Sequence, residues 1–329
     1  MGFEVSKPGL LSTLQDEGRF GFRKYGVIAS GPMDSFAHRT ANILVGNKAD
    51  ACTLEMTLSG PILTAQKDMV IAICGADMEA EIDGTPMPLW RPFNIYQRER
   101  LTIDYARQGC RAYLAVSGGF EGRSVLGSQS TYLRAGLGGY EGRGLQVGDQ
   151  LNVGEGEMKR FARNQPAGAV STLIRPPYEE NPTVRVTWGK EATYFTENSR
   201  WQFAAQGFMV TPQSDRMGYR LKGDQLRMTN DVSHEMISEA VVQGTIQVPA
   251  GGQPILLMAD CQTTGGYPRI AHVITADLPL VAQVKPGGTI RFEVVSHREA
   301  QEQLLLQAMD LRLLEAGMQA WYQDHESRR

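Results

Sequence analysis

The chain has 329 residues and a formal net charge of -3, with 42% hydrophobic and 21% charged residues. This length exceeds what one hydrophobic core usually supports, so two domains are expected. The composition is that of a globular protein, and the slight acidity leaves no electrostatic footprint for nucleic acid or for a membrane surface.

The cysteines and the first residues suggest the compartment. The sequence has 4 cysteines without C-x-x-C spacing, so buried thiols in a reducing environment are expected rather than disulfides or a metal site. The first residues lack an apolar signal core, and no run approaches the roughly 18 apolar residues of a membrane span. We therefore expect a cytoplasmic protein.

The two halves of the chain resemble each other at a fixed offset of 184 residues, as from Ser30 to Ser214. A repeat this long favours two copies of one domain over a solenoid, and a single composite site between the copies. The other matching pairs are Met33 with Met217, Glu55 with Glu239, Gly60 with Gly244, Ile62 with Ile246 and Ile71 with Ile255, while Asp77 matches Asp260 with a slip of one residue.

The elements expected in chain order are mostly strands. A helix is predicted from Asp34, which can cap it, to Val45, before Gly46; the second copy, from Met217 to Leu226, is less clearly helical. Short β-branched or apolar runs bounded by turns predict strands and suggest barrels or sandwiches. These runs are 70–73, 101–103, 113–116, 183–186, 255–258 and 290–294.

The predicted domains are residues 1–165, which include a Gly-rich segment, then 183–296, then a terminal helix and tail over 297–329. The helix is predicted because apolar residues recur at helical spacing, and its role is either packing on its own domain or docking a partner. The residues on this spacing are Leu304, Ala308, Leu311, Met318 and Trp321.

Several catalytic motifs are missing from the sequence. There is no G-x-x-x-x-G-K-[ST] loop for nucleotide phosphates, no H-E-x-x-H and no Cys/His spacing for zinc. We therefore expect no metal and no cofactor bound by this chain alone, and any ATP chemistry to need another chain.

Polar, glycine-containing loops carry the remaining signal. The strongest spans Asp260 to Pro268, because consecutive polar side chains and a Gly-Gly pair follow an apolar strand. Glycines let backbone N–H groups approach a ligand, and Asp, Gln and Thr offer directed hydrogen bonds. The alternative is that these loops are turns whose side chains satisfy the local backbone. The other loops are 15–19, 30–34, 126–136 and 214–220.

These loops carry a family resemblance, since the motifs read P-G-L-L-S-T-L-Q-D-E-G-R-F-G, S-G-P-M-D, L-G-S-Q-S-T-Y-L-R-A-G-L-G-G and A-D-C-Q-T-T-G-G-Y-P-R-I-A. From about residue 3 to 295 the chain resembles the KipA family, also described as allophanate-hydrolase subunit 2 or carboxyltransferase-like proteins. The resemblance implies a mainly β chain of two tandem cyclophilin-like β-barrel domains, which agrees with the internal duplication.

The resemblance also implies function. Members look like the C subunit of an ATP-dependent 5-oxoprolinase, which works with A and B subunits to open 5-oxo-L-proline to L-glutamate. Two alternatives follow from the same family: a regulator that antagonises KipI, an inhibitor of a sporulation histidine kinase, and a biotin-dependent carboxyltransferase component for a urea-like amide. The implied partners are the A subunit, KipI or the B subunit, together with a small amide substrate.

The site follows from this chemistry as a hypothesis. A lactam carbonyl can accept hydrogen bonds from Gln262 or Thr263, and its N–H needs an acceptor such as Asp260. A substrate carboxylate suits Arg216 or Arg19. The expected catalytic residues are Asp260, Gln262 and Thr263, and the expected substrate-binding residues are Arg216, Thr264, Gly265, Arg19, Asp34 and Asn42.

Overall fold

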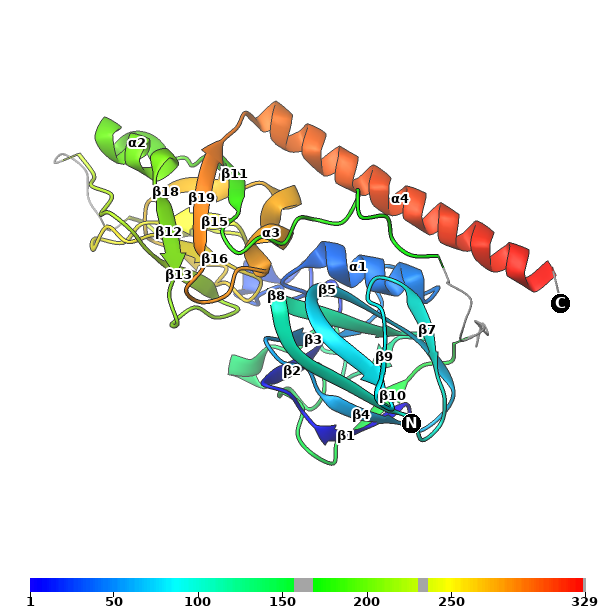
Figure 1. The fold of residues 1–329 in the computed structure, drawn as a ribbon. Helices are drawn as coiled ribbons and strands as arrows, with labels where there is room; N and C mark the ends of the chain where they lie inside the picture. Colours follow the sequence, from blue (N-terminus) through cyan, green and yellow to red (C-terminus); the bar gives the residue numbers. More distant parts are fainter. Residues whose placement is uncertain (157–167, 230–235, 328–329) are drawn as a thin grey trace. The chain divides into compact units, whose positions relative to one another are not determined.

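The computed structural model describes residues 1–156, 168–229 and 236–327 and divides into two compact units (Figure 1). Unit 1 comprises Met1–Arg19, Asp34–Pro176 and Gln307–Arg329, and unit 2 comprises Phe20–Met33 and Pro177–Leu306. Neither unit is one continuous stretch of sequence. Residues 20–33 belong to unit 2 although the segments on both sides of them belong to unit 1, and residues 307–327 belong to unit 1 although they follow unit 2 in the sequence. The expected boundary at 165 lies outside the described residues.

Unit 1 is built on a sheet with the order β2-β3-β8-β4-β1-β10-β9, and β5 pairs with β6, β7 and β8. The strands are β1 (Phe3–Lys7), β2 (Leu11–Gln15), β3 (Thr53–Thr57), β4 (Ile62–Ala65), β5 (Met69–Ile82), β6 (Thr85–Pro86), β7 (Pro92–Ile95), β8 (Arg100–Val116), β9 (Phe120–Glu121) and β10 (Gln150–Val153). All these pairings are antiparallel, as sheets linked by short connections allow.

The long strands β5 and β8 form the centre of unit 1. The predicted strands at 101–103 and 113–116 are two parts of β8, which pairs with β5 from Ile71↔Val116 to Ile82↔Leu101. The first half of β5 is buried at every position, because α1 (Ser35–Leu44) packs against β5 and β8. Gly75 marks a bulge in β5: its φ is 110°, and a Cβ there would lie 2.4 Å from the carbonyl oxygen of Arg111.

The predicted first helix is confirmed. Asp34 is its N-cap and accepts a hydrogen bond of 2.9 Å from the backbone N–H of Ala37. Phe36, Ala37 and Ala41 are buried, so the apolar side that the sequence predicted is the side that packs. The helix ends at Leu44, shortly before Gly46.

Unit 2 is a closed barrel in the order β11-β18-β15-β16-β13-β12-β19. Its strands are β11 (Thr183–Trp188), β12 (Gly207–Val210), β13 (Gly218–Lys222), β15 (Thr245–Gln247), β16 (Ile255–Leu257), β18 (Arg269–Val273) and β19 (Thr289–Val294). Parallel pairing of β11 with β19 closes the barrel. The core includes Phe203 and Phe292, whose stacked ring centroids lie 4.8 Å apart.

Short elements complete both units. A two-stranded ribbon, β14 (Glu239–Ala240) with β17 (Thr264–Gly265), lies outside the barrel sheet of unit 2. The remaining helices are α2 (Glu197–Ala205), α3 (Leu278–Ala282) and α4 (His297–Ser327), with 3-10 turns η1 (Arg23–Tyr25), η2 (Leu133–Ala135), η3 (Ala192–Tyr194) and η4 (Thr275–Asp277).

The 184-residue offset does not carry over to strand pairing. In unit 1, Ile62 pairs with Lys7 and Thr102, on β1 and β8. Its counterpart Ile246 pairs with residues of β16 and β18. Met33 precedes a helix, whereas Met217 precedes strand β13. The mainly β architecture with two barrel-like sheets is as predicted, but the offset does not predict which strands are neighbours.

Helix α4 is amphipathic, and its packed face agrees with the predicted one in its second half, where Leu311 and Trp321 are half-buried. Met318 and Tyr322 are buried, and the Tyr322 hydroxyl donates a hydrogen bond of 2.6 Å to the carbonyl oxygen of Leu44 at the end of α1. Leu304, expected on the packed face, is 42% exposed. A second apolar row, which we call the α4 stripe, faces solvent. The stripe consists of Leu305, Leu306, Met309 and Leu313.

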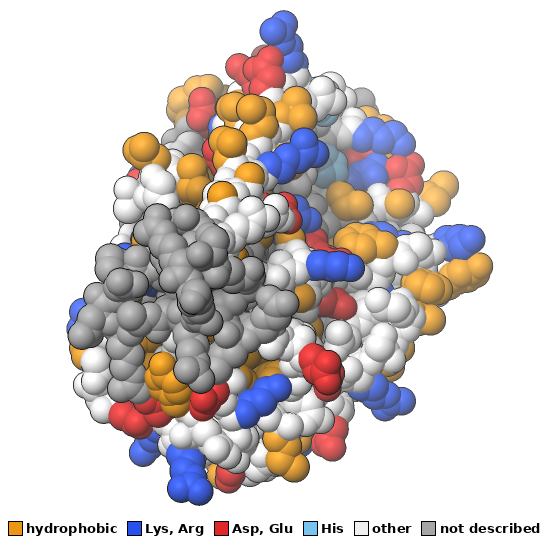
Figure 2. Space-filling model, turned by 90° about the vertical axis from the view of Figure 1, so that its right-hand side faces the viewer, with side chains coloured by type: hydrophobic (Ala, Val, Ile, Leu, Met, Phe, Trp, Pro, Cys, Tyr) orange, Lys and Arg blue, Asp and Glu red, His pale blue; other side chains and the backbone are white. Residues whose placement is uncertain are grey.

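The surface shows mixed charge. On the face drawn in Figure 2, acidic and basic side chains are interspersed with hydrophobic ones, in agreement with the small net charge. Among the described residues, no helix has the length and apolar character needed to cross a bilayer.

Candidate functional site

An ion pair anchors the loop that the sequence singled out in unit 2. Arg216 precedes β13 and Asp260 follows β16, and these strands are paired, so the two residues meet at one end of the barrel. The Arg216 Nε and Nη2 groups donate to the two Asp260 carboxylate oxygens over 2.9 and 3.1 Å. Nη2 also donates to the carbonyl oxygen of Gly31, over 2.6 Å.

This pair is buried, with residue exposures of 5% for Arg216 and 4% for Asp260. Both carboxylate oxygens of Asp260 and one edge of the guanidinium are therefore committed to each other. The expected roles, Asp260 toward a lactam N–H and Arg216 toward a substrate carboxylate, are not set up by this geometry. A buried pair of this kind fixes the start of the 260–266 loop instead.

The middle of the loop presents an amide. The Gln262 Nε2 group lies 3.4 Å from Oε1 of Gln247 on β15, and Gln247 donates to the carbonyl oxygen of Tyr267 over 3.3 Å. The backbone oxygen of Thr263 accepts from the N–H of Val241, over 3.1 Å. Gln262 and Thr263 are half-buried, so both have one side available to a ligand.

Thr264 and Gly265 lie in β17 of the ribbon. Thr264 is exposed and pairs with Ala240, while Gly265 pairs with Glu239. A Cβ at position 265 would lie 2.6 Å from Nε2 of Gln247, so a larger residue there would displace that amide. The predicted Gly-Gly pair therefore serves close packing of ribbon and barrel.

An ion cluster fastens the ribbon to the barrel. Arg269 donates to both oxygens of the buried Glu191 over 2.7 and 2.6 Å, and to Glu239 on β14 over 2.6 Å. Lys190 also donates to Glu239, over 2.9 Å. Burial raises the pKa of Glu191, but the hydrogen bonds from Arg269 outweigh burial, and the net pKa lies below its ordinary value.

Sequence reasoning missed the contribution of Arg23. Its side chain donates to the carbonyl oxygen of Val241 and forms a hydrogen bond with Cys261. Burial raises the pKa of the Cys261 thiol above its ordinary value despite the nearby guanidinium. Cys261 is therefore a protonated, buried thiol, as expected for all the cysteines. No local motif around Arg23 indicates this long-range contact.

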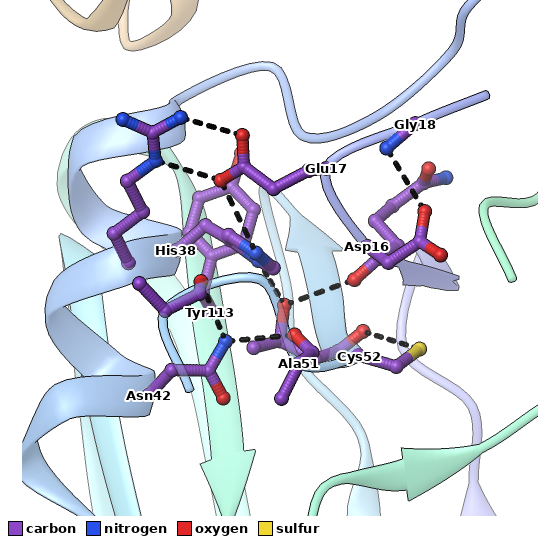
Figure 3. A network of polar contacts seen from close by, with 12 residues as sticks. Asp16, Glu17, Gly18, His38, Asn42, Ala51, Cys52 and Tyr113 are labelled. Atoms are coloured by element: carbon purple, nitrogen blue, oxygen red, sulfur yellow. Dashed lines mark hydrogen bonds and ion pairs between the residues drawn. The ribbon is translucent and has the colours of Figure 1, made fainter. Parts of the chain in front are cut away.

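A second polar network lies in unit 1 (Figure 3). Arg39 holds Glu17 through two hydrogen bonds of 2.7 and 2.6 Å. The Glu17 carboxylate lies 3.8 Å from Nε2 of His38, and the other His38 nitrogen lies 2.8 Å from the Thr53 hydroxyl. Burial lowers the pKa of His38, and the nearby carboxylates only partly oppose this, so the imidazole is neutral at physiological pH.

Asp16 holds part of the Gly-rich segment, residues 128–130, in place through hydrogen bonds in the same unit. Its carboxylate accepts hydrogen bonds from the hydroxyls of Ser128 and Ser130, over 2.6 and 2.7 Å, and from the N–H groups of Gln129 and Gly18, over 2.5 and 2.9 Å. Burial raises the pKa of Asp16, yet these four donors outweigh it and lower the pKa overall. The segment is thus an integral part of unit 1 and not a linker.

The three remaining predicted residues have structural roles in unit 1. Asn42 donates to the carbonyl oxygens of Ala49 and Ala51, over 3.3 and 2.7 Å, and accepts from Asn47 over 3.0 Å. Arg19 is buried and donates to the carbonyl oxygen of Ser130. Asp34 caps α1. These side chains hold loops in place, and the geometry does not direct them toward a ligand.

The described residues hold no cluster of three or more His, Cys, Asp or Glu side chains arranged for a metal ion. The fold and its loops thus define a β protein whose unit 2 presents an anchored polar loop, with Gln262 and Thr263 half-exposed. Residues 25–294 match the family described as carboxyltransferase domain, subdomain A and B, and the chain belongs to that family.

The relatives of the chain agree with this assignment. The chain is 40% identical over 289 residues to the 5-oxoprolinase C subunit of Haemophilus influenzae, covering 88% of this chain and 90% of the relative. Identity to the 5-oxoprolinase C subunit of Escherichia coli is 39% over 299 residues, which cover 90% of this chain and 92% of that relative. The crystal structure of Kluyveromyces lactis urea carboxylase is similar to this chain with a TM-score of 0.89 and 30% sequence identity. The similar region covers 96% of this chain and 29% of the urea carboxylase chain.

Proposed function

We propose that this chain is the C subunit of a 5-oxoprolinase that uses ATP to open 5-oxo-L-proline to L-glutamate in the cytoplasm. The observation that carries the proposal is the identity of 40% and 39% to two proteins of that name, with at least 90% of each relative covered. In this proposal the chain supplies part of the substrate site, and ATP is used by the complex with the A and B subunits.

The anchored loop supports the roles that we propose for the residues of the site. Gln262 and the Thr263 hydroxyl contact the lactam carbonyl, because they are half-buried and belong to the loop fixed by Asp260 and Arg216. Asp260 and Arg216 are positioning residues. Thr264 and Gly265 place the edge of the ribbon beside the Gln247 amide.

A reconstitution tests this proposal. The purified chain is mixed with the A and B subunits from the same source, ATP and 5-oxo-L-proline, and glutamate is measured. We expect glutamate only when all three chains and ATP are present. Turnover by this chain alone, or full turnover without it, contradicts the proposal.

A variant series tests the site. Gln262→Ala is expected to lower kcat/KM of the complex about tenfold, as the loss of one transition-state hydrogen bond does. Gln225→Ala, at an exposed position of unit 2 outside the 260–265 loop, is the matched control and leaves kcat/KM unchanged. Equal activity of both variants contradicts the role of Gln262.

The α4 stripe is the proposed surface for a partner protein. Four large apolar side chains on one helix face are each more than 50% exposed, and contiguous exposed apolar surface of this kind marks interaction sites. The partner is the B subunit, or the related KipI in a regulatory complex. Because α4 also packs on α1, substitutions test this role better than deletion of the helix.

Carboxyl transfer to a urea-like amide is a second candidate. The family description and the overlap with urea carboxylase favour it. A carboxybiotin on a separate carrier protein would donate the carboxyl group in this reaction. The measurement is urea-dependent loss of labelled carboxyl from a carboxylated carrier; no loss in the presence of this chain contradicts the candidate.

A further inference from the structure

We propose that a cavity on the outer wall of the unit 2 barrel binds a small organic dicarboxylate. The cavity has a volume of about 710 Å³, within the roughly 300–1,000 Å³ of small-molecule sites. Strand β13 contributes Arg220 and Lys222 to its lining, β16 contributes Ile255, and the preceding loop contributes Pro249 and Pro254. It shares no residue with the 260–265 loop.

Two cations define the charge of the cavity. Arg220 and Lys222 are exposed and alternate with the buried Tyr219 and Leu221, so they point outward from the barrel. Two positions along a strand separate their Cα atoms by about 6.6 Å. Among the described residues, no carboxylate lines the cavity and no ion pair includes Arg220 or Lys222. An anion with two carboxylates can therefore satisfy both cations.

The loop that leads into β16, beside the cations, is held by hydrogen bonds within the protein. Gly252, at a φ of 72°, closes a turn in which its N–H donates to the carbonyl oxygen of Pro249 over 2.9 Å. The Gln253 side chain accepts from the N–H of Gly223 and donates to its carbonyl oxygen, over 2.9 and 3.0 Å. A ligand therefore does not have to order this loop, which favours affinity.

A buried hydroxyl lies beneath the lining of the cavity. Thr211 lines the cavity, and its Oγ1 atom is buried with no hydrogen-bond partner among the described residues. Because this atom has almost no accessible surface, a ligand in the cavity does not contact it. Thr211 lies beside Arg220, since the Thr211 N–H donates to the Arg220 carbonyl oxygen over 2.9 Å. Pro249, Pro254 and Ile255 suit a flat apolar body between the two carboxylates.

Isothermal titration calorimetry with terephthalate, using the full chain, tests the proposal. We expect saturable binding of terephthalate and none of its neutral diamide. Arg220→Gln and Lys222→Gln each weaken binding about tenfold, as loss of a charge-assisted hydrogen bond does. Arg291→Gln, an exposed position on β19 outside the cavity, leaves affinity within about twofold and serves as the matched control.

Thr211→Val provides a second control, at a lining residue and without a change of charge. The variant removes a buried hydroxyl that the ligand does not contact, so we expect terephthalate affinity within about twofold of wild type. Absence of binding, or binding that Arg220→Gln and Lys222→Gln leave unchanged, overturns the proposal. Binding of a hexaglutamate peptide without binding of terephthalate also overturns it, because the site would then serve an acidic chain and not a small molecule.

Discussion

Arg216 and Asp260 are 44 residues apart in sequence and hold each other through two hydrogen bonds in the interior of unit 2. The same guanidinium reaches Gly31, which is 185 residues away. Three segments of the chain, around 31, 216 and 260, therefore meet at one ion pair. Its disruption affects the position of every residue in the loop that follows Asp260.

The first prediction concerns this pair. Asp260→Asn leaves a buried guanidinium without its counter-charge, so we expect the free energy of unfolding to fall by about 3 kcal/mol. Urea denaturation followed by circular dichroism measures the change. Asp224→Asn, at an exposed position in unit 2, is the control and should leave the midpoint unchanged.

A double variant tests the coupling of the two residues. The free energy of unfolding of Arg216→Met/Asp260→Asn should fall by less than the sum of the decreases in the single variants, because no buried charge remains. Strict additivity would argue against the pair.

The second prediction is a pH dependence from His38. Burial lowers its pKa below the ordinary value of 6.5, so the unfolded chain binds a proton more readily than the folded chain. The His38 contribution to stability is complete above about pH 6.5 and is lost as the pH falls from there toward the folded pKa. Stability measured from pH 7.5 to 5.5 should decrease on acidification.

A variant isolates the His38 contribution. His38→Asn keeps a polar atom near Thr53 but cannot titrate, so the slope of stability against pH should be smaller in this variant. His272→Asn is the comparison, because burial also lowers the pKa of His272, in unit 2. An unchanged slope in His38→Asn would assign the acid sensitivity to other groups.

The third prediction concerns Asp16. Asp16→Asn puts an amide N–H against donors from Ser128, Ser130 and Gln129, so at least one of them loses its acceptor. We expect a loss of about 2 kcal/mol in stability and faster amide exchange over residues 126–131. Hydrogen exchange followed by mass spectrometry measures the change around Asp16 and over residues 126–131. Asp104→Asn, at an exposed position on β8, should leave the exchange of 126–131 as it is.

The fourth prediction concerns the α4 stripe. The substitution set Leu305→Glu, Met309→Glu and Leu313→Glu places charges on an exposed apolar face, so the Tm of the isolated chain should change little. Binding to the B subunit, measured by surface plasmon resonance, should weaken at least tenfold if this face is the interface. Gln319→Glu, exposed on the same helix, is the control. Wild-type affinity in the triple variant would move the interface elsewhere.

The sequence predicts local elements well in this protein. Asp34 and Gly46 mark the ends of α1 because capping depends on residues within one turn. The runs at 70–73 and 290–294 are strands because β-branched residues and turns have local signatures. In contrast, the extent of β8 and the pairing of Ile62 and Ile246 depend on neighbours distant in sequence. Those neighbours differ between the two units despite the similar local pattern.

The candidate site shows the same limit. The motif around Asp260 identified an unusual loop, and Gln262 and Thr263 are half-exposed there. The roles expected for Arg216 and Asn42 rested on side-chain chemistry alone. Each is instead engaged by protein groups that only the tertiary structure brings close, Asp260 and Gly31 for Arg216, and the 49–51 backbone for Asn42. Arg23 has no sequence signal at all, because its partners lie more than 200 residues away.

The path of the chain between the units also bears on biosynthesis. Residues 20–33 are made long before the barrel with which they pack, since its last strand, β19, ends at Val294. Tyr322, which packs on the end of α1, is made later still. During translation, residues 20–33 therefore remain without their packing partners until the barrel strands have been synthesised. Neither unit can complete its packing until nearly the whole chain has left the ribosome, so a chaperone that covers the nascent chain should raise the yield of folded protein.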